Sequence, residues 1–427
     1  MNVMRKILFL TIIAFISAGS LLAQKSALRD SKRSLGRDDF NEARTLIQQA
    51  AQNPETANDP ETWKIMGDIG NKAFDNERTK AMLGQNANDK AMYDGLMESY
   101  APYLKADSLG QIPDEKGRVR NKVRGDISSI LQANHPFYIN GGVYYNDQGN
   151  YSKAADFFEM YWNIPTLPLY DKPESTFSLD STYQTIKYYA IITAIQAEQH
   201  ERALAMLKRA TSEPFIENSS YQESDLYELM ASEYINLDDS AMYLETLNLG
   251  AEKFPKSKYF IPNLVNVFIR EGNTEKAMQY LDQAISNDPS NSCDLNSVKG
   301  ALLAEQGDFE GAESEYKKAL VQDPNCERAL EALAVNYILQ AQNIKEASVQ
   351  ISDRQQQVAN DEKAIKFYEA SLAPLEKYAE LLRSRDASES EKQSALLKLR
   401  NVYYNLSNMG IDKSTEMEAV EKELNLN

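Results

Sequence analysis

Side chains that could carry catalysis or bind a metal are few and widely separated in this sequence. There are two histidines, His135 and His200, and two cysteines, Cys293 and Cys326. A histidine-based triad or metal site would have to recruit its residues from distant segments. No glycine-rich phosphate loop, Gly-x-Ser-x-Gly elbow or His-Glu-x-x-His helix occurs. We therefore predict no catalytic residue, no metal ligand and no cofactor.

The chain is strongly acidic. It has 63 aspartates and glutamates against 46 lysines and arginines, and a formal net charge of −17. Such a charge repels phosphate backbones and anionic lipid headgroups, so we expect neither nucleic acid nor a membrane surface as a partner. It favours a basic protein partner, or simply keeps the chain soluble. No spacing among the carboxylates marks a general acid and its base, so they add no argument for an enzyme.

The first 23 residues have the layout of a secretory signal. Arg5 and Lys6 are followed by an apolar run at 7–16, and then by small residues up to a cleavage position before Gln24. The apolar run is too short to span a bilayer comfortably. We predict that residues 1–23 are a signal peptide, with an uncleaved membrane anchor as the alternative.

Cleavage would leave an exported chain that is not inserted in a membrane. The removed segment holds two basic and no acidic residues, so the net charge would move from −17 to −17 − 2 = −19. We expect a periplasmic location, with an extracellular or outer-membrane-associated one as the alternative.

The remaining sequence repeats a pattern in which an alanine follows a glycine after five residues. The pattern occurs at Gly149 and Ala154, at Gly272 and Ala277, and at Gly307 and Ala312. The last two copies are 307 − 272 = 35 residues apart, and in each a proline follows the alanine by twelve residues. Glycine suits a left-handed turn and proline ends a helix, so each copy predicts two antiparallel helices joined by a tight turn.

This pattern resembles the tetratricopeptide repeat. The copy at 293–324 carries it best, and the copies at 258–289 and 135–165 match less completely; at 258–289, Val265 replaces the family's glycine. The matching residues of the best copy are Gly300, Leu303, Gly307, Ala312, Tyr316, Ala319 and Pro324. The resemblance implies an all-α fold, a right-handed superhelical solenoid of antiparallel helix hairpins, in which neighbouring hairpins bury each other's apolar faces.

Outside these copies the register weakens. We predict an N-terminal helical region with degenerate repeats at 24–132, followed by the repeat array at 133–427. Within the array, a stretch without glycine or proline predicts an extended helical insertion at about 340–373, and residues 391–427 predict a C-terminal hairpin. We expect one continuous solenoid rather than separate domains.

Two segments interrupt the repeats. Residues 164–180 contain three prolines and predict a long loop. Residues 109–124 are locally basic. We interpret this basic segment as a helix face that pairs with nearby carboxylates, with a contact for an acidic partner as the alternative. Its basic residues are Lys116, Arg118, Arg120, Lys122 and Arg124.

Tetratricopeptide arrays commonly hold an extended peptide or a partner helix along the first helices of their hairpins. Carried over by register, the predicted partner-binding positions are Glu228, Ser232, Asn236, Asn266, Arg270, Ser297 and Glu305. Because Arg270 is the one basic residue among them, we do not expect the family's carboxylate clamp. The alternative is a groove filled by the chain's own loops or C-terminal helix.

The two cysteines lie at nearly equivalent points of adjacent repeats. The chain is predicted to be exported to an oxidising compartment, where disulfides persist. Packed helices lie about 8–10 Å apart, which exceeds the Cα separation that a disulfide normally tolerates. A disulfide between Cys293 and Cys326 and a pair of free thiols therefore both stay open. A bridge would staple two repeats and would have no catalytic role.

The repeats, the signal and the missing chemistry together predict a non-enzymatic scaffold for protein–protein interaction in the cell envelope. The alternative is a glycan-binding envelope protein resembling the helical-repeat receptors for starch-like sugars, with Trp63, Trp162 and the tyrosines as stacking platforms. A hydrolase built on helical repeats lacks an identifiable acid and base pair. The sequence indicates a protein partner without identifying that partner or the oligomeric state.

Overall fold

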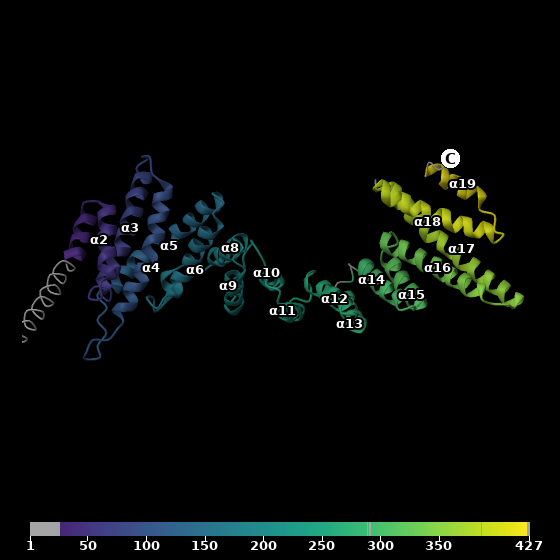
Figure 1. The fold of residues 1–427 in the computed structure, drawn as a ribbon, viewed down its shortest axis with the longest axis horizontal. Helices are drawn as coiled ribbons and strands as arrows, with labels where there is room; N and C mark the ends of the chain where they lie inside the picture. Colours follow the sequence, from purple (N-terminus) through teal and green to yellow (C-terminus); the bar gives the residue numbers. More distant parts are fainter. Residues whose placement is uncertain (1–25, 288, 290–291, 386, 425–427) are drawn as a thin grey trace, which may run out of the picture. The chain divides into compact units, whose positions relative to one another are not determined.

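The computed structural model describes residues 26–287, 289, 292–385 and 387–424, and all regular structure within these residues is helical. The predicted fold class is confirmed, because consecutive helices run antiparallel and pack as hairpins (Figure 1). The predicted signal peptide at 1–23 lies outside the described residues. Among the helices that are described, none combines the length and the apolar character needed to cross a lipid bilayer.

The chain divides into two compact units, with unit 1 ending at Asp238 and unit 2 beginning at Asp239. Unit 1 opens with a helix over 26–36. It continues with α2 (Phe40–Gln52), α3 (Pro60–Met82), α4 (Asp89–Gly110), α5 (Arg124–Asp147), α6 (Tyr151–Asn163), η1 (Ile164–Thr166), α7 (Pro173–Thr176), α8 (Ser181–Gln196), α9 (His200–Ser212) and α10 (Glu223–Asn236). The predicted loop at 164–180 holds only the short η1 and α7 before α8 begins.

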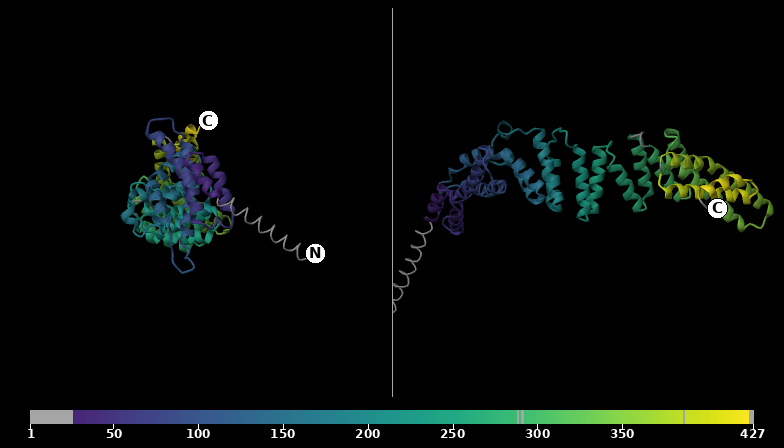
Figure 2. Two further views of the ribbon diagram at one scale, coloured as in Figure 1. Left: turned by 90° about the vertical axis from the view of Figure 1, so that its left-hand side faces the viewer. Right: turned by 90° about the horizontal axis from the view of Figure 1, so that it is seen from above.

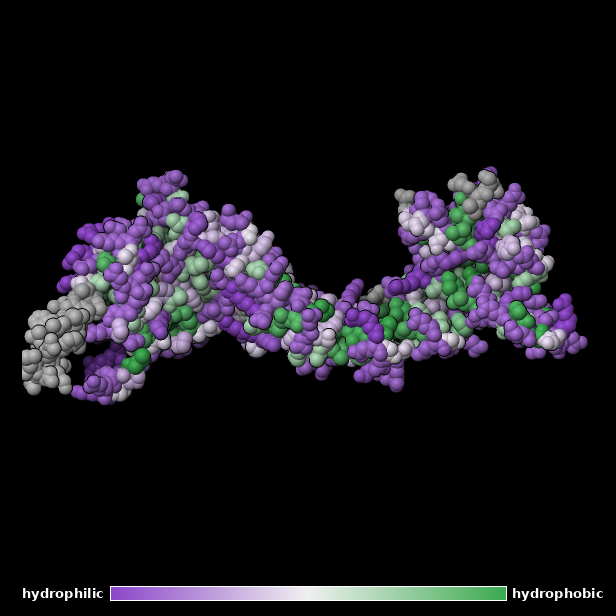
Figure 3. Space-filling model, in the orientation of Figure 1, coloured by the Kyte–Doolittle hydropathy of each residue, from purple (hydrophilic) through white to green (hydrophobic). Residues whose placement is uncertain are grey.

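Unit 2 contains the remaining helices, which pack against their neighbours in chain order (Figure 2). They are α11 (Ser240–Lys253), α12 (Phe260–Arg270), α13 (Thr274–Asn287), α14 (Ser292–Glu305), α15 (Phe309–Gln322), α16 (Glu327–Val349), α17 (Arg354–Ser384), α18 (Glu389–Asn408) and α19 (Ser414–Glu423). The visible surface of each unit is mainly hydrophilic and is interrupted by hydrophobic patches (Figure 3).

The predicted regions can be compared with the observed helices. The regional boundary between residues 132 and 133 falls inside α5, which is one unbroken helix. One continuous solenoid was expected, and the structure divides the chain into two compact units after Asp238. The predicted insertion at 340–373 spans parts of α16 and α17, which form a long hairpin of their own. The predicted C-terminal hairpin at 391–427 corresponds to α18 and α19.

Five hairpin turns share one backbone conformation. The second residue after the first helix has a positive φ, between 57° and 82°. Glycine takes this position at 149, 272 and 307, whereas Asp38 and Glu198 take it in the other two turns. In all five, the side chain five residues later is a fully buried alanine. These alanines are Ala43, Ala154, Ala203, Ala277 and Ala312, each 0% exposed. The degenerate hairpins thus keep the turn and lose only its glycine.

We predict that replacing Glu198 by glycine raises the free energy of unfolding of unit 1 by up to about 1 kcal/mol. A side chain in the left-handed region costs about 1–2 kcal/mol, and part of that gain is returned because glycine is freer in the unfolded chain. Urea unfolding followed by the fluorescence of Trp63 and Trp162, the chain's two tryptophans, reports on unit 1. Glu198→Ala keeps a Cβ and should give no gain; an equal gain would mean that backbone strain is not the cause.

In the best-matching hairpin, a glycine on the first helix makes room for a ring on the second. A Cβ built on Gly300 would lie 2.5 Å from the ring of Tyr316. In the hairpin at 258–289, Val265 takes the glycine position, and Leu281 stands where the ring would be, since 316 − 300 = 281 − 265 = 16. Both are buried. The departure at Val265 is therefore matched by a smaller partner on the second helix.

Cys293 and Cys326 form a disulfide in the structure, with their Cα atoms 5.9 Å apart. Cys293 lies in the first turn of α14, and Cys326 is the residue directly before α16. The usual distance between packed helix axes argued against the bridge. That distance does not apply here, because the two cysteines lie at helix ends that converge. The bridge joins the starts of two successive first helices, beside the buried Ala319 and Ala329.

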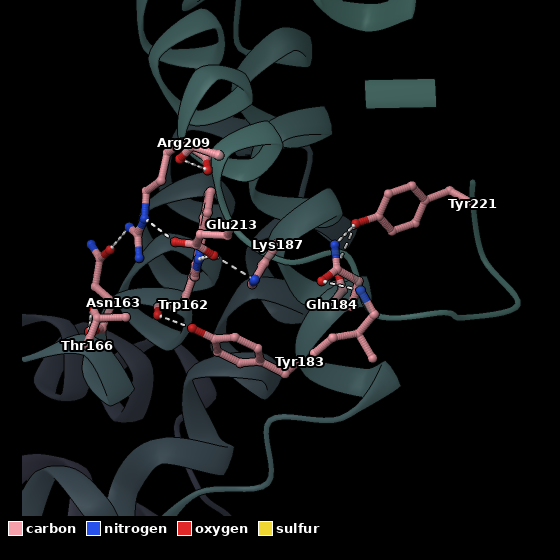
Figure 4. Close-up of polar contacts among 11 residues, drawn as sticks. Trp162, Asn163, Thr166, Tyr183, Gln184, Lys187, Arg209, Glu213 and Tyr221 are labelled. Atoms are coloured by element: carbon pink, nitrogen blue, oxygen red, sulfur yellow. Dashed lines mark hydrogen bonds and ion pairs between the residues drawn. The ribbon is translucent and has the colours of Figure 1, made fainter. Parts of the chain in front are cut away.

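Unit 1 buries a charged network where α6, α8 and α9 meet (Figure 4). Lys187 is 4% exposed and its Nζ donates to Glu213 Oε2 at 2.6 Å. Glu213 also accepts hydrogen bonds from Trp162 Nε1 at 3.1 Å and from Arg209 Nε at 2.8 Å. The Arg209 guanidinium lies 4.1 Å from the centre of the Trp162 ring, and the Tyr183 hydroxyl donates to the Trp162 carbonyl at 2.9 Å. The network ties three helices to the segment that follows α9.

Candidate partner-binding groove

The first helices of three successive hairpins in unit 2 are α12, α14 and α16. α14 and α16 contact each other directly, in addition to their contacts with α15. An open cavity of about 450 Å³ lies against them, and we call it the groove cavity. Most of its lining is apolar. The lining includes Val298, Ala301 and Leu302 of α14, and Ala332, Val335 and Leu339 of α16.

The lining extends to the two neighbouring helices. Ile269 of α12 and Tyr316 of α15 complete the apolar surface, and Glu305 contributes a carboxylate. Burial, and after it the charge of Glu305, raises the pKa of Tyr316 to about 12. The phenol is therefore neutral at physiological pH and can serve as an apolar wall with one polar end.

The lining of the groove cavity carries both charges. Arg328 and Glu331 of α16 contribute to its lining. The Arg328 guanidinium lies 3.6 Å from the Asp294 carboxylate, and Lys398 Nζ lies 3.1 Å from Glu331 Oε1. Both pairs are partly exposed, so water and salt weaken them and they can open toward a ligand.

One buried acceptor in the lining is left without a donor. Asn336 is 2% exposed, and its Nδ2 donates to the Phe309 carbonyl at 3.0 Å. Its Oδ1 receives no hydrogen bond from the part of the chain that the structure describes. Because a buried carbonyl oxygen costs free energy without a donor, this position suits a water molecule or an N–H group of a bound segment.

The structure brings together two of the seven predicted groove residues. Ser297 and Glu305 both line the groove cavity. Asn266 and Arg270 are exposed on α12, where their neighbour Ile269 is the lining residue. The other three belong to α10 of unit 1. Of these, Glu228 is half-buried, and Ser232 and Asn236 are exposed.

Ser297 differs from the prediction in its exposure. It is 2% exposed, and its hydroxyl donates to the Cys293 carbonyl one turn earlier at 2.7 Å. Its position faces the start of α16, where the disulfide closes the space. Ser297 is therefore a buried part of the cavity lining, and Glu305 is the predicted lining residue that is exposed.

Sequence reasoning missed the contribution of α16. In the next repeat, Ala334 takes the place of Gly300, a shift of 334 − 300 = 34 residues. The equivalents of Ser297, Ala301 and Glu305 therefore lie 34 residues further along the chain. Those equivalents all line the groove cavity, and extending the register by one repeat would have found them. They are Glu331, Val335 and Leu339.

The two histidines lie on different helices of unit 1. His135 is stacked on Tyr161 with ring centres 4.0 Å apart, and burial lowers its pKa to about 4. His200 Nδ1 lies 2.8 Å from Glu233 Oε2. In the described ranges, no three histidine, cysteine or acidic side chains are grouped so that they could hold a metal ion. The groove cavity thus offers shape, apolar surface and charge for binding.

Comparison with solved structures finds tetratricopeptide-repeat proteins. The chain is similar to YrrB, described as a TPR protein with an unusual peptide-binding site, at 18% identity over 46% of this chain and 89% of YrrB, with a TM-score of 0.30. It is also similar to the C-terminal part of a TPR protein from Cytophaga hutchinsonii (14% identity, 65% of this chain, 94% of that one, TM-score 0.33).

A third similar structure is a tetratricopeptide repeat protein from Parabacteroides merdae, at 14% identity over 69% of this chain and all of that one, with a TM-score of 0.33. No protein-family model matches the chain, and no curated protein matches it. These similarities are distant, and the chain's own hairpins and their shared turn define its fold.

Proposed function

We propose that this chain is a non-enzymatic protein-interaction scaffold of the cell envelope, which binds a peptide or helix of a partner protein in the groove cavity of unit 2. The observation that supports this is an open, mainly apolar cavity on the first helices of two stacked hairpins. Exposed apolar surface of this kind is typical of sites that receive apolar side chains of a partner.

The cavity suits one or two large apolar side chains. Its volume of about 450 Å³ is within the range of ligand-binding clefts. In protein interfaces, a few buried anchor residues supply most of the binding free energy, with polar residues around them. Val335 and Leu339 would contact such an anchor, and Glu305 and Glu331 would favour a basic residue beside it.

The envelope location rests on the sequence of residues 1–23 and agrees with the disulfide, because disulfides persist in oxidising compartments. Fractionation of cells that express the full chain, with determination of its N-terminus, tests this part separately. A mature protein that begins near Gln24 outside the cytoplasm is expected. Recovery in the cytoplasm with an intact Met1 would leave the groove proposal standing and overturn the location.

One of the aromatic rings that the glycan-binding alternative needs for stacking against a sugar is not accessible. Trp162 is fully buried in the charged network of unit 1, and its ring faces Arg209 instead of solvent. Trp63 is half-buried, and its indole N–H donates to the Ala57 carbonyl at 2.7 Å. Neither indole therefore presents a free face with a free N–H for stacking against a sugar ring.

Filling the groove cavity should abolish partner binding. Ala301→Trp places a large side chain into the space between α14 and α16, and we expect peptides selected on the wild-type chain to bind at least about 10-fold more weakly. The peptides come from a random 12-residue display library selected on the purified full chain, and their affinities are measured by fluorescence anisotropy. Selected peptides should share an apolar residue beside a basic one.

Val321→Trp is the matched control, because Val321 is 79% exposed near the end of α15 and does not line the cavity. Circular dichroism should show equal helix content in both variants. If every selected peptide binds Ala301→Trp as tightly as the wild type, the groove cavity is not the binding site and the proposed function fails.

A further inference from the structure

The loop between α4 and α5, residues 111–123, concentrates positive charge on an acidic chain. It contains four basic and two acidic residues, a net charge of 4 − 2 = +2, against −17 for the whole chain. The sequence favoured a helix face here, but the structure shows a loop that extends beyond the ends of its flanking helices (Figure 1). We call residues 111–123 the basic loop.

The tip of the basic loop is held in one conformation by Asp114. The Asp114 Oδ1 accepts hydrogen bonds from the backbone N–H groups of Lys116 and Arg118, both at 2.9 Å. Hydrogen bonds from these N–H groups lower the pKa of Asp114. The backbone closes a turn from Asp114 to Arg118, in which Gly117 takes a φ of 72°. The tip is thus a defined turn.

The base of the loop is fixed by a second set of contacts. The Asn121 side chain donates to Asp107 Oδ1 at 2.7 Å and accepts from the backbone N–H of Arg124 at 3.0 Å. Arg124 pairs with Asp107 through two hydrogen bonds, at 2.8 and 2.9 Å. A Cβ on Gly110 would lie 2.5 Å from Asn121, so the amide fits tightly against the end of α4. Both ends of the exposed segment are therefore anchored.

The residues between these anchors face solvent. Ile112 is 63% exposed and Val119 is 50% exposed. Arg120 is 3.5 Å from Asp114, whereas Lys116 and Lys122 have no carboxylate within 4.0 Å in the described part of the chain. Two exposed aliphatic side chains and two lysines without a carboxylate partner among the described residues therefore lie on this anchored loop, beside two arginines that pair with Asp114.

We propose that the basic loop is a second docking site, which binds an acidic segment of a protein partner through its cations and covers Ile112 and Val119 with an apolar residue of that segment. This site lies in unit 1, and its argument is independent of the groove cavity. A pre-ordered loop loses little conformational entropy on binding. Complementary charge would steer the acidic segment toward the basic loop.

A protein segment fits this surface better than an anionic membrane. Asp126, at the start of α5, has a side chain that is 72% exposed, and Glu115 is exposed within the loop itself. A flat anionic surface would meet these carboxylates within about 8 Å, the screening length at physiological salt. A narrow acidic segment can contact Arg120 and Lys122 and avoid them.

The test uses the double variant Arg120→Glu with Lys122→Glu in the full chain. Random 12-residue display peptides are selected on the wild type, and those that the variant no longer captures are sequenced. We expect these peptides to be rich in aspartate and glutamate with at least one apolar residue, to bind the variant at least about 10-fold more weakly, and to weaken as salt is raised. Both changed residues are exposed, and Arg120 contributes only an exposed ion pair with Asp114, so helix content and thermal unfolding should change little.

Lys256→Glu with Lys258→Glu makes the same change in charge in unit 2 and should leave these peptides bound. The proposal is overturned if the loop variant captures every peptide that the wild type captures, or if the lost peptides are not acidic. It is also overturned if phosphatidylglycerol vesicles bind the wild type in a loop-dependent manner and no acidic peptide does. Peptides whose binding is lost in Ala301→Trp but kept in the loop variant would support the groove cavity alone. The two proposals can therefore be tested independently.

Discussion

Replacing Glu213 by alanine is expected to lower the free energy of unfolding of unit 1 by about 3–5 kcal/mol, which is the usual cost of leaving a buried charge without its partner. Lys187 would keep its ammonium group at 4% exposure with no carboxylate to pair with. The indole N–H of Trp162 and the guanidinium of Arg209 would lose the same acceptor. Urea unfolding followed by tryptophan fluorescence measures the loss directly, because Trp162 is part of the network.

A compensated variant separates the unpaired charge from the lost packing. Lys187→Met with Glu213→Leu removes both charges and keeps apolar volume, and replacing a buried ion pair by apolar groups is often close to neutral. We therefore expect the double variant to regain most of the stability that Glu213→Ala loses. If it is as unstable as Glu213→Ala, packing and not the unpaired lysine determines the effect.

The same network predicts a dependence on pH. Burial opposes ionisation of Glu213, but the hydrogen bond and charge of Lys187, and then those of Arg209, outweigh it and lower its pKa below the usual 4.5. A carboxyl whose folded pKa is lowered stabilises the fold above its unfolded pKa, and this stability is lost as the pH falls through the folded value. Unit 1 should therefore lose stability below about pH 4.5.

His135 adds a separate loss of stability of unit 1, which begins at a higher pH. Burial lowers the pKa of His135 from 6.5 to about 4, so protonation of the unfolded chain begins to destabilise unit 1 below about pH 6.5. Glu213→Ala retains this histidine and lacks the carboxyl. Subtracting its stability curve from that of the wild type isolates Glu213, and a difference that stays constant from pH 7 to pH 3 would contradict the assigned role.

The all-helical hairpins were predictable because three of them keep glycine in the turn and alanine five residues later. The hairpins that begin near residue 26 and at α8 were only partly recognised, because Asp38 and Glu198 occupy the left-handed position. Aspartate is tolerated there and glutamate is not favoured, so neither residue signals the turn. The buried Ala43 and Ala203 are the remaining sequence signal, and alanine alone is too common to locate a repeat.

Groove residues could be predicted only in those repeats whose register was recognised in the sequence. Glu305 was found because 293–324 matches the repeat pattern well. Val335 and Leu339 were missed because α16 runs on past the length of a repeat helix, and no glycine marks its register. Exposure could not be read from register either, as Ser297 shows: its burial depends on how closely the starts of α14 and α16 approach, which a disulfide between distant residues decides.

The buried network of unit 1 had no sequence signal. Lys187 and Glu213 are separated by 26 residues, in a chain where charged residues are frequent. The segment after α9 brings Glu213 back to α8, and no periodic pattern predicts that path. Binary patterning identifies which helix faces are apolar, whereas a charged pair inside the core depends on how the non-helical segments run between hairpins.

Cys326→Ser is expected to lower the free energy of unfolding of unit 2 by about 3–4 kcal/mol, relative to the oxidised wild type. The bridge closes a loop over a separation of 33 residues, and the restriction of the unfolded chain by a loop of this length corresponds to that free energy. Hydrogen exchange of amides in α14 and α16, read by mass spectrometry, measures the change in the part of the chain that the bridge joins. Exchange in α5 and α6 of unit 1 should stay the same.

The disulfide also links stability to the groove, because it fixes the starts of the two helices that line the cavity. Cys326→Ser should therefore weaken the binding of groove-dependent peptides without changing the binding of peptides that depend on the basic loop. Reduction of the wild type should reproduce both effects, and reductant should have no effect on the variant, which has no partner for Cys293. Equal exchange of α14 and α16 in the oxidised and reduced wild type would show that packing of Ala319 and Ala329 holds these helix ends without the bridge.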